Sequence, residues 1–431
     1  MSAPYSRNPL LRRTGTYPFQ RLTEARNAAA RLHPERPLVD LGAGEPREPT
    51  PELIRRAMIE AVGAETVSAY PQSVGIPELR TAVATWIAGR YGVTLDPDRH
   101  VLPTLGSKEL VFTLAQVLVD VPGGRDLVGV PQPAYPVYER GARFAGADVL
   151  ELPLRADAGF LPDLEAITSD QWSRLALLWV NYPNNPTAAV ASRDWYRAAA
   201  DRCREHGVVL ASDEAYSELW FTGDAPDSAL QVGTDGDDLT GVLTVNTLSK
   251  RSSMPGYRSG FVAGDADLIA ALKAFRPSVG VAPQRFVQHA AVAAWGDEAH
   301  VDAVRERYRE KLAVLQPGLD ALGLQNAGGP ASFFRWLALP EDWASAPWAR
   351  EALAAPPTAH LLEILTDRKP PGGTAGPGSA AYAAALLHAG VVAAPGAFFG
   401  PAGEGYVRVA LVPTMVDCAE AARRLQALAA R

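Results

Sequence analysis

Cysteine is scarce in this chain of 431 residues, which contains only Cys203 and Cys418. The two thiols form no CxxC pair, so the sequence excludes a cysteine metal site and a disulfide framework. We interpret both as helix-face residues. The seven histidines show no metal-ligand spacing, so no metal is expected, and we interpret His300 and the others as surface or capping residues.

Long apolar runs and an excess of positive charge are also absent. No run approaches the roughly 18 residues of a membrane span, and residues 1–13 are polar and lack the apolar core of a signal peptide. The net charge of -7 and the pI of about 5.6 argue against a nucleic-acid surface, which needs a concentrated basic face. We therefore expect a cytoplasmic protein that acts on small molecules and binds neither nucleic acid nor membrane.

The chain does contain apolar strand-like runs that alternate with helical stretches such as Leu53–Val62 and Ile76–Arg90. This alternation predicts crossover connections and a mainly parallel sheet. The runs are Val101–Leu105, Leu127–Val130, Ala147–Leu152, Leu175–Val180, Val208–Ala211, Val242–Val245 and Ser259–Ala263. The length exceeds that of a usual single domain, so we expect a large and a smaller domain.

The predicted large domain covers residues 48–290, and the predicted small α+β domain combines residues 1–47 with 291–431. The small domain should contain a long amphipathic helix over 297–322, a strand over 333–337, a helix near 382–388 and a final strand over 406–412. Residues 340–380 are rich in Ala, Pro and Gly, and we interpret them as a flexible surface insertion rather than an active-site lid.

Lys250 is the most informative residue, because the hydroxyls of Thr247 and Ser249 precede it and the guanidinium of Arg258 follows it. A lysine amine can form a Schiff base with pyridoxal phosphate. The phosphate then needs hydroxyl donors and a nearby cation, which these three residues supply.

Two further polar segments follow apolar runs. Asn185 lies in a turn after the run that ends at Val180, and Asp213 ends a second run, with Tyr216 three residues later. Ligands of open α/β folds bind at such carboxyl ends of strands. A carboxylate beside a pyridine nitrogen keeps that nitrogen protonated and makes the ring an electron sink, so Asp213 is the candidate for this role.

The series Asn185, Asp213, Tyr216, Lys250 and Arg258 resembles that of the fold-type I pyridoxal-phosphate enzymes, specifically the class I/II aminotransferases, over almost the whole chain. The resemblance implies an α/β protein whose large domain has a mainly parallel, seven-stranded sheet, with a smaller α+β domain. It also implies a homodimer, because the segment around Tyr70 and Pro71 is similar to one that crosses subunits in the family. Closed two-fold dimers are also the commonest oligomers.

The same resemblance assigns roles to residues elsewhere in the chain. Gly44 belongs to a glycine turn that faces the substrate carboxylate, and Arg408 grips that α-carboxylate through two parallel hydrogen bonds. Tyr135 stacks on the cofactor ring, and Tyr70 reaches the phosphate of the neighbouring subunit. A helix is expected to begin at residues 106–108, and its N-terminal amides form a phosphate site. Gly106, Ser107 and Lys108 are therefore expected to bind the cofactor. Ala188 replaces a usual glycine and Thr247 a more frequent serine.

These roles define an expected mechanism. Lys250 moves a proton from the substrate α-carbon to C4′ of the cofactor, acting first as general base and then as general acid. Asn185 and Tyr216 hydrogen-bond the ring oxygen, and Asn185 also belongs to the substrate site. Arg408 fixes which bond lies perpendicular to the ring. The nitrogen then passes to a second 2-oxo acid, for which the resemblance implies 2-oxoglutarate.

Five segments, in chain order, are similar to those of the N-succinyldiaminopimelate aminotransferases of lysine biosynthesis. They are residues 15–22, 44–47, 249–252, 295–301 with 308–311, and 403–408. That substrate carries distal carboxylates, so a second cation is expected, and Arg47 and Arg285 are the candidates.

Two alternatives remain open. The first is another enzyme of the same fold, namely an aspartate, aromatic, alanine or secondary-pathway aminotransferase or a carbon-sulfur lyase, which would share every cofactor contact. The second is a non-catalytic, cofactor-binding sensor domain of a regulator. Such regulators carry an N-terminal DNA-binding helix-turn-helix, and too few residues precede Gly44 to form one. The presence of Lys250 also favours chemistry.

Overall fold

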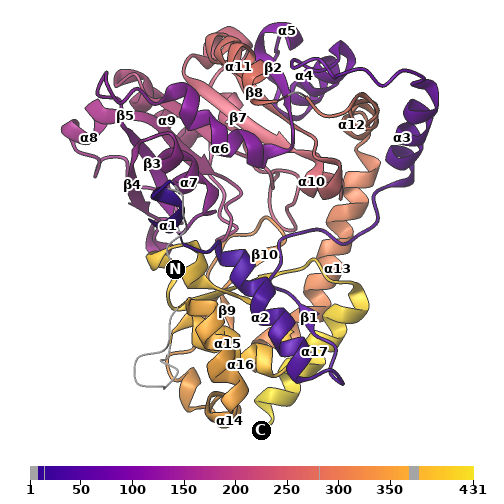
Figure 1. Cartoon of the computed structure of the whole chain (residues 1–431), viewed down its shortest axis with the longest axis vertical. Helices are drawn as coiled ribbons and strands as arrows, with labels where there is room; N and C mark the ends of the chain where they lie inside the picture. The colour runs from indigo at the N-terminus through magenta and orange to yellow at the C-terminus, as the bar shows by residue number, and fades with distance from the viewer. Residues whose placement is uncertain (1–7, 14, 281, 368–377) are drawn as a thin grey trace, which may run out of the picture. The chain divides into compact units, whose positions relative to one another are not determined.

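The computed structural model describes residues 8–13, 15–280, 282–367 and 378–431. They form two compact units, each considered separately below (Figure 1). The larger unit contains residues 45–310 and 328–334, and the smaller unit contains residues up to 44, 311–327 and 335–431. The larger unit thus continues beyond residue 290, through α12 (Arg285–Trp295) and the first half of α13 (Ala299–Ala321).

The larger unit is built on a seven-stranded sheet in the order β2-β8-β7-β6-β5-β3-β4. The five strands from β7 to β4 in this order run parallel to one another, whereas β8 runs antiparallel to both β7 and β2. The predicted mainly parallel, seven-stranded sheet is confirmed. Its strands are β2 (Val101–Thr104), β3 (Leu127–Gln132), β4 (Asp148–Pro153), β5 (Leu175–Asn181), β6 (Val209–Asp213), β7 (Val242–Thr247) and β8 (Gly260–Gly264).

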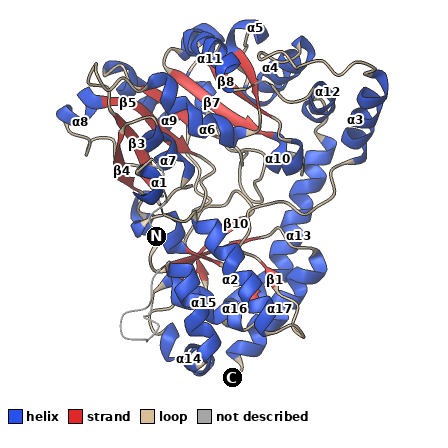
Figure 2. Cartoon of the chain, viewed as in Figure 1, coloured by secondary structure: helices blue, strands red, loops and turns tan. Residues whose placement is uncertain are grey.

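The apolar composition of the central strands explains their position. Every residue of β3 and β5 is buried, as expected for strands covered on both faces. Helix α6 (Ser107–Leu118) contacts β5, and α9 (Arg193–Glu205) contacts β6 (Figures 1 and 2). Because β5, β6 and β7 are parallel neighbours, their carboxyl ends lie at one edge of the sheet. At this edge Asp213 pairs with Asn181 of β5 and with Val245 of β7.

A second packed region of the larger unit joins α3, α4 and α12 beside the sheet. Its centre is aromatic, with the ring centroids of Trp86 and Trp295 4.6 Å apart and Phe261 5.2 Å from Trp295. The remaining helices of this unit are α3 (Glu52–Ala64), α4 (Pro77–Tyr91), α5 (Pro97–His100), α7 (Val137–Phe144), α8 (Ser169–Arg174), α10 (Leu248–Arg251) and α11 (Ala266–Val279).

The smaller unit has a four-stranded sheet in the order β12-β13-β10-β9 and a parallel pair formed by β1 and β11. The strands are β1 (Val39–Asp40), β9 (Gln325–Asn326), β10 (Phe334–Ala338), β11 (Val391–Val392), β12 (Ala394–Pro395) and β13 (Tyr406–Ala410). The helices are α1 (Leu10–Arg13), α2 (Pro18–Leu32), α14 (Pro347–Ala354), α15 (Pro356–Thr366), α16 (Ser379–His388) and α17 (Met415–Ala429). Cys418 lies on α17 and Cys203 on α9, so both cysteines are helix residues as predicted.

Residues 340–366 differ from the flexible insertion expected there, because they contain α14 and α15. Pro347 and Pro356 occupy the first positions of these helices, where a proline costs no hydrogen bond. Trp348, Leu361 and Leu365 are buried, so the segment contributes to the core of the smaller unit. Alanine, which enriched the segment, is the strongest helix former. Residues 368–377 of the expected insertion lie outside the described residues.

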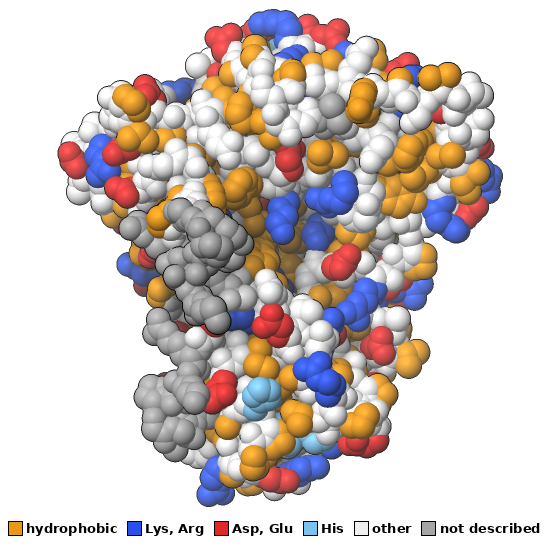
Figure 3. Space-filling view, viewed as in Figure 1, with side chains coloured by type: hydrophobic (Ala, Val, Ile, Leu, Met, Phe, Trp, Pro, Cys, Tyr) orange, Lys and Arg blue, Asp and Glu red, His pale blue; other side chains and the backbone are white. Residues whose placement is uncertain are grey.

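Charged side chains of both signs are mixed over the face that Figure 3 shows. Apolar side chains gather around the position of α3, where Leu53, Ile59 and Val62 are 37%, 72% and 52% exposed. Among the helices that the structure describes, none is both long and apolar enough to cross a membrane.

Close packing between α13 and α17 generates a stability prediction. A Cβ added at Gly318 would lie 2.6 Å from Cα of Ala422, so Gly318→Ala must push α17 away. We expect a loss of about 1–3 kcal/mol in the free energy of unfolding, measured by denaturant titration. Gly89→Ala, at an exposed position of α4 with no atom within 4 Å, is the control and should not destabilise the protein. Equal midpoints for the two variants would contradict the packing argument.

Candidate active site

Lys250 is presented by a short helix, α10, that starts as soon as β7 ends. The hydroxyl of Thr247 fixes this turn, since it accepts from the backbone N–H of Ser249 at 3.1 Å and lies 3.0 Å from the carbonyl oxygen of Ser259. The hydroxyls of Thr247 and Ser249 are 2.9 Å apart. Nζ of Lys250 lies 5.6 Å from the ring centroid of Phe333, so the amine is half-buried beside aromatic rings.

Asp213 ends the neighbouring strand β6 and is 5% exposed. Its carboxylate accepts hydrogen bonds from the hydroxyl of Tyr138 at 2.8 Å and from the backbone N–H of Ala215 at 3.2 Å. Burial raises the pKa of Asp213, although the Tyr138 and Ala215 hydrogen bonds and the charge of Lys250 oppose the rise. A carboxylate in this setting is best satisfied by a further cationic N–H donor.

Asn185 and Tyr216 lie at the same sheet edge in the larger unit. The backbone N–H of Asn185 donates to Oδ1 of Asn181 at 2.8 Å, and Nδ2 of Asn181 donates to the carbonyl oxygen of Asp213 at 2.7 Å. This pair of bonds ties the turn after β5 to the end of β6. The ring of Tyr216 packs against Phe334, with centroids 5.2 Å apart, and both Asn185 and Tyr216 are buried.

Positive charge gathers at the N-terminus of α6, which Gly106 caps with φ +71°. Arg258 lies against this end, where its Nη2 donates to the carbonyl oxygen of Leu105 at 3.1 Å. Burial lowers the pKa of Lys108, and the charges of Arg258 and Arg140 lower it further. Helix N-terminal amides together with three cations form a setting suited to a phosphate group.

The two predicted tyrosines have different surroundings. Tyr135 is half-buried, with its ring 6.0 Å from that of Tyr138 and nearly perpendicular to it. Tyr70 is 94% exposed, so within this chain it is not packed into the group formed by Asp213, Lys250 and Arg258.

Two residues directly after Lys250 hold α10 in place. Arg251 is 1% exposed, donates to the carbonyl oxygen of Ala294 at 2.7 Å, pairs with Glu298, and lies 4.9 Å over the ring of Trp295. Ser252 lies 2.9 Å from Nε2 of His300.

His300 also contacts Asp297 through Nδ1 at 2.7 Å. A surface or capping role was expected for His300. Its side chain is 5% exposed, so the surface role is wrong, and the residue is a buried link between α13 and the lysine-bearing turn. Burial lowers its pKa, although the hydrogen bond with Asp297 opposes this. Sequence reasoning missed His300, Arg251, Tyr138 and Arg140, because single charged or aromatic residues on helices give no local signal of a distant partner.

The remaining predicted residues are an arginine and a glycine in the smaller unit. Arg408, on β13, is 1% exposed and donates through Nη2 to the carbonyl oxygen of Gly42 at 2.8 Å. Its guanidinium lies over the rings of Phe19 at 5.1 Å and Phe399 at 4.8 Å, so it is held flat. Gly44 lies two positions after Gly42 in the sequence and is half-buried.

The two arginines proposed for a distal carboxylate differ in their contacts. Nε of Arg285 pairs with Glu65 at 2.9 Å, whereas Arg47 is exposed between Glu45 and Glu48 in sequence. Among the residues described, no group of three or more His, Cys, Asp or Glu side chains is placed to hold a metal ion.

Comparisons with known proteins agree over most of the chain. Residues 36–425 match the family model for aminotransferase class I and II. The chain is 34% identical to the LL-diaminopimelate aminotransferase of Aquifex aeolicus over 91% of each protein. It resembles the substrate-bound structure of BacF from Bacillus subtilis (TM-score 0.83, 29% identity, covering 99% of this chain and 98% of the other). A Thermus thermophilus structure, named as a probable N-succinyldiaminopimelate aminotransferase, matches with a TM-score of 0.79 and 30% identity. The match covers 95% of this chain and 100% of the Thermus chain.

The contact between Gly106 and Arg258 yields a test of the phosphate site. A Cβ at Gly106 would lie 2.4 Å from Nη2 of Arg258, so Gly106→Ala must displace the guanidinium. We expect pyridoxal phosphate to bind about tenfold to a hundredfold more weakly, since one charge-assisted hydrogen bond contributes roughly 1.5–3 kcal/mol. Absorbance titration of the cofactor-free protein measures this. Gly256→Ala, with no atom within 4 Å, should bind normally; equal affinities for both variants would remove Arg258 from the site.

Proposed function

The chain belongs to the class I and II aminotransferases, which use pyridoxal 5′-phosphate, and we propose that its amino donor is N-succinyl-LL-2,6-diaminopimelate and its acceptor 2-oxoglutarate. Such a reaction would serve lysine and diaminopimelate biosynthesis. The observation that carries the transfer chemistry is the position of Asp213 and Lys250 at the carboxyl ends of β6 and β7, which are adjacent in the sheet.

The residues present fit the cofactor. Gly106, Ser107, Lys108 and Arg258, with the hydroxyls of Thr247 and Ser249, would hold its phosphate at the N-terminus of α6. The bound cofactor supplies an electron sink for the bonds of the substrate α-carbon.

Asp213 would pair with the ring nitrogen, and this pairing explains how a carboxylate 5% exposed remains charged. Asn185 and Tyr216 would donate to the ring oxygen, and Tyr135 would stack on the ring.

Lys250 acts on the substrate in this proposal. Its amine would hold the cofactor in the resting enzyme. During transfer, the freed amine would accept a proton from the substrate α-carbon and donate it to C4′ of the cofactor. The rings of Tyr216 and Phe333 lie 6.0 and 5.6 Å from Nζ, so aromatic side chains border the amine. Arg408 would bind the α-carboxylate together with the backbone near Gly44.

The choice of donor rests on the five sequence segments described above and on the similarity to the Thermus protein. A second candidate is unsubstituted LL-diaminopimelate, because the Aquifex relative is named an LL-diaminopimelate aminotransferase and aligns with this chain over 91% of both proteins. The two molecules share a distal carboxylate but differ at the far nitrogen, which is a cation in one and a neutral amide in the other. Arg47 and Arg285 remain the two candidates for the second cation, and Nε of Arg285 pairs with Glu65 at 2.9 Å.

A panel of amino donors tests the assignment. With 2-oxoglutarate as acceptor, we expect kcat/KM for N-succinyl-diaminopimelate to exceed that for aspartate, phenylalanine and alanine by about tenfold or more, because one extra charge-assisted hydrogen bond contributes at least that much. Lys250→Ala should be inactive toward every donor. Arg47→Ala should raise KM for the succinylated donor and leave alanine nearly unaffected.

The panel also separates the alternatives. Preference for unsubstituted LL-diaminopimelate would replace the donor within the same family. Preference for an aromatic or simple acidic amino acid would contradict the diaminopimelate assignment, and release of sulfide or pyruvate from cysteine derivatives would indicate a carbon-sulfur lyase. More than a few percent of wild-type turnover in Lys250→Ala would overturn the role of this lysine.

We also propose a homodimer in which Tyr70 reaches the phosphate bound by the partner subunit. Its support is the 94% exposure of Tyr70 and the exposed apolar side chains that precede it, including Ile59 (72%) and Val67 (75%). Mixing Tyr70→Phe with Lys250→Ala subunits checks this directly, because each mixed dimer would hold one complete site. We expect activity above that of either variant alone after mixing and re-equilibration. An active monomer in sedimentation, or no gain on mixing, would exclude the shared site.

A further inference from the structure

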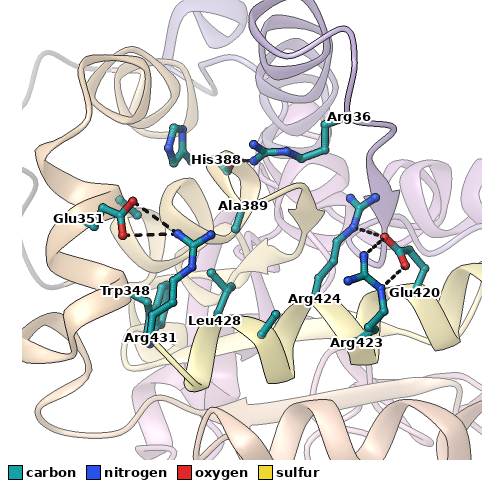
Figure 4. A pocket seen from close by; sticks show the side chains of 12 residues that line it. Arg36, Trp348, Glu351, His388, Ala389, Glu420, Arg423, Arg424, Leu428 and Arg431 are labelled. Atoms are coloured by element: carbon teal, nitrogen blue, oxygen red, sulfur yellow. Dashed lines mark hydrogen bonds and ion pairs between the residues drawn. The ribbon is translucent and has the colours of Figure 1, made fainter.

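A pocket rich in arginine lies within the smaller unit, and none of its lining residues belongs to the candidate active site. Its volume is about 450 Å³, within the range of sites for small molecules. It is formed by the C-terminal part of α17, by α14 and by the residues that end α16 (Figure 4). Its charged side chains are Arg36, Arg423, Arg424, Arg431, Glu351 and Glu420.

The charges of the pocket do not balance. Among the side chains that line it, four arginines face two glutamates, which leaves an excess of two positive side-chain charges. Glu420 is already committed, since it accepts from Nε and Nη2 of Arg423, both at 2.8 Å, and from Nε of Arg424 at 2.7 Å. These hydrogen bonds, from Arg423 first and then Arg424, lower the pKa of Glu420 to about 2. Glu420 therefore stays ionised and has little capacity left for Arg36.

Arg36 and Arg424 converge on the same short stretch of backbone. Nη1 of Arg36 donates to the carbonyl oxygen of His388 at 2.9 Å, and Nη1 of Arg424 donates to that of Gly390, also at 2.9 Å. A Cβ at Gly390 would lie 2.6 Å from Nη1 of Arg424 and 3.0 Å from Cδ of Arg36, so both chains crowd this glycine. The side chains of Arg36 and Arg424 thus pass the same glycine, and an anion within reach of both guanidinium groups would be attracted by both charges.

The guanidinium groups retain donors for such an anion. Each carries five N–H donors, and in the part of the chain that the structure describes Arg36 uses only Nη1, for one backbone carbonyl. Arg431 reaches both oxygens of Glu351 only at 3.4 Å, with both side chains more than half exposed, so this contact is weak. A ligand with stronger acceptors could take its place.

The remaining lining fits an organic ligand rather than a bare ion. Trp348 and Leu428 are buried and supply an apolar floor. Burial lowers the pKa of His388, and the charges of His33 and Arg36 lower it further, so this imidazole is neutral near pH 7 and can accept or donate a hydrogen bond.

We propose that this pocket binds a small organic polyanion, with carboxylate or phosphate oxygens held by Arg36, Arg423 and Arg431 and its carbon skeleton against Trp348. Guanidinium groups match both kinds of oxyanion with paired hydrogen bonds. The pocket shares no lining residue with the proposed cofactor or substrate site, so it adds a second ligand site to the chain.

Calorimetric titration of the holoenzyme tests the proposal, because the bound cofactor already fills the phosphate site at α6. The probes are pyrophosphate and citrate, each added at constant ionic strength. We expect at least one to bind with a dissociation constant below about 1 mM. Arg36→Gln and Arg423→Gln should each weaken that binding by about tenfold, the loss expected for one charge-assisted hydrogen bond. Binding of pyrophosphate alone would identify a phosphorylated ligand, and binding of citrate alone a polycarboxylate.

Two control variants make the result specific. Arg197→Gln removes a half-exposed arginine from α9 in the other unit, and Arg408→Gln removes the proposed substrate-carboxylate contact. Neither should change the affinity of the probe. The proposal is overturned if neither probe binds, if Arg197→Gln weakens binding as much as Arg36→Gln does, or if only Arg408→Gln abolishes it. Arg423 is 68% exposed, so its replacement should preserve folding even if that of Arg36 does not.

Discussion

The burial of one carboxylate, that of Asp213, is the constraint on which the site depends. A buried carboxylate is costly unless hydrogen bonds and a positive charge compensate it. Three strands cooperate to hold it: Asp213 pairs with Asn181 of β5 and Val245 of β7, and the hydroxyl of Tyr138 donates to it at 2.8 Å. Since burial still raises its pKa, these neutral donors do not compensate it fully. In the function proposed above, the protonated ring nitrogen of pyridoxal phosphate would supply the missing positive charge, so a site that suits this carboxylate would also suit the cofactor.

Rigidity beneath Lys250 follows from the residues after it. Arg251 is fully enclosed between the ring of Trp295 and the end of α12, and Ser252 is joined through His300 to Asp297. The backbone of α10 is thereby fixed from below, while the lysine side chain stays half-buried among aromatic rings. The proton-carrying role proposed for Lys250 would need this combination, because the amine would have to move between two atoms while the Cα stays in place. The aromatic packing of Trp86, Phe261 and Trp295 is thus part of the support of the site as well as of the core.

The sequence predicted two kinds of feature: apolar runs that recur along the chain, and polar residues that directly follow such runs. The seven strands followed from continuous apolar runs, and Asn185, Asp213 and Lys250 were found because each follows such a run. Helices α14 and α15 were not expected, because the Ala, Pro and Gly content suggested a loop; the prolines instead begin the helices and Leu361 and Leu365 are buried. The pairing of Arg285 with Glu65, the link from His300 to Ser252 and the hydroxyl of Tyr138 at Asp213 join residues 48 to 220 positions apart, and a single sequence carries no record of such pairings.

Arginine is used in two physically different ways in the smaller unit. Arg408 is held between Phe19 and Phe399 with one donor on the backbone, so its orientation is set before any ligand arrives and little entropy is lost on binding. Arg36, Arg423 and Arg431 are exposed to solvent and are held only by contacts at the surface, with the carbonyl oxygen of His388, with Glu420 and with Glu351, so a ligand there must order them further. A single carboxylate is then a weak ligand for the pocket on α17, because one contact must compensate the entropy lost on ordering the arginines. Several anionic groups on one molecule provide several contacts against the same entropy loss. This difference favours a polyanion for the pocket and a lone α-carboxylate for Arg408.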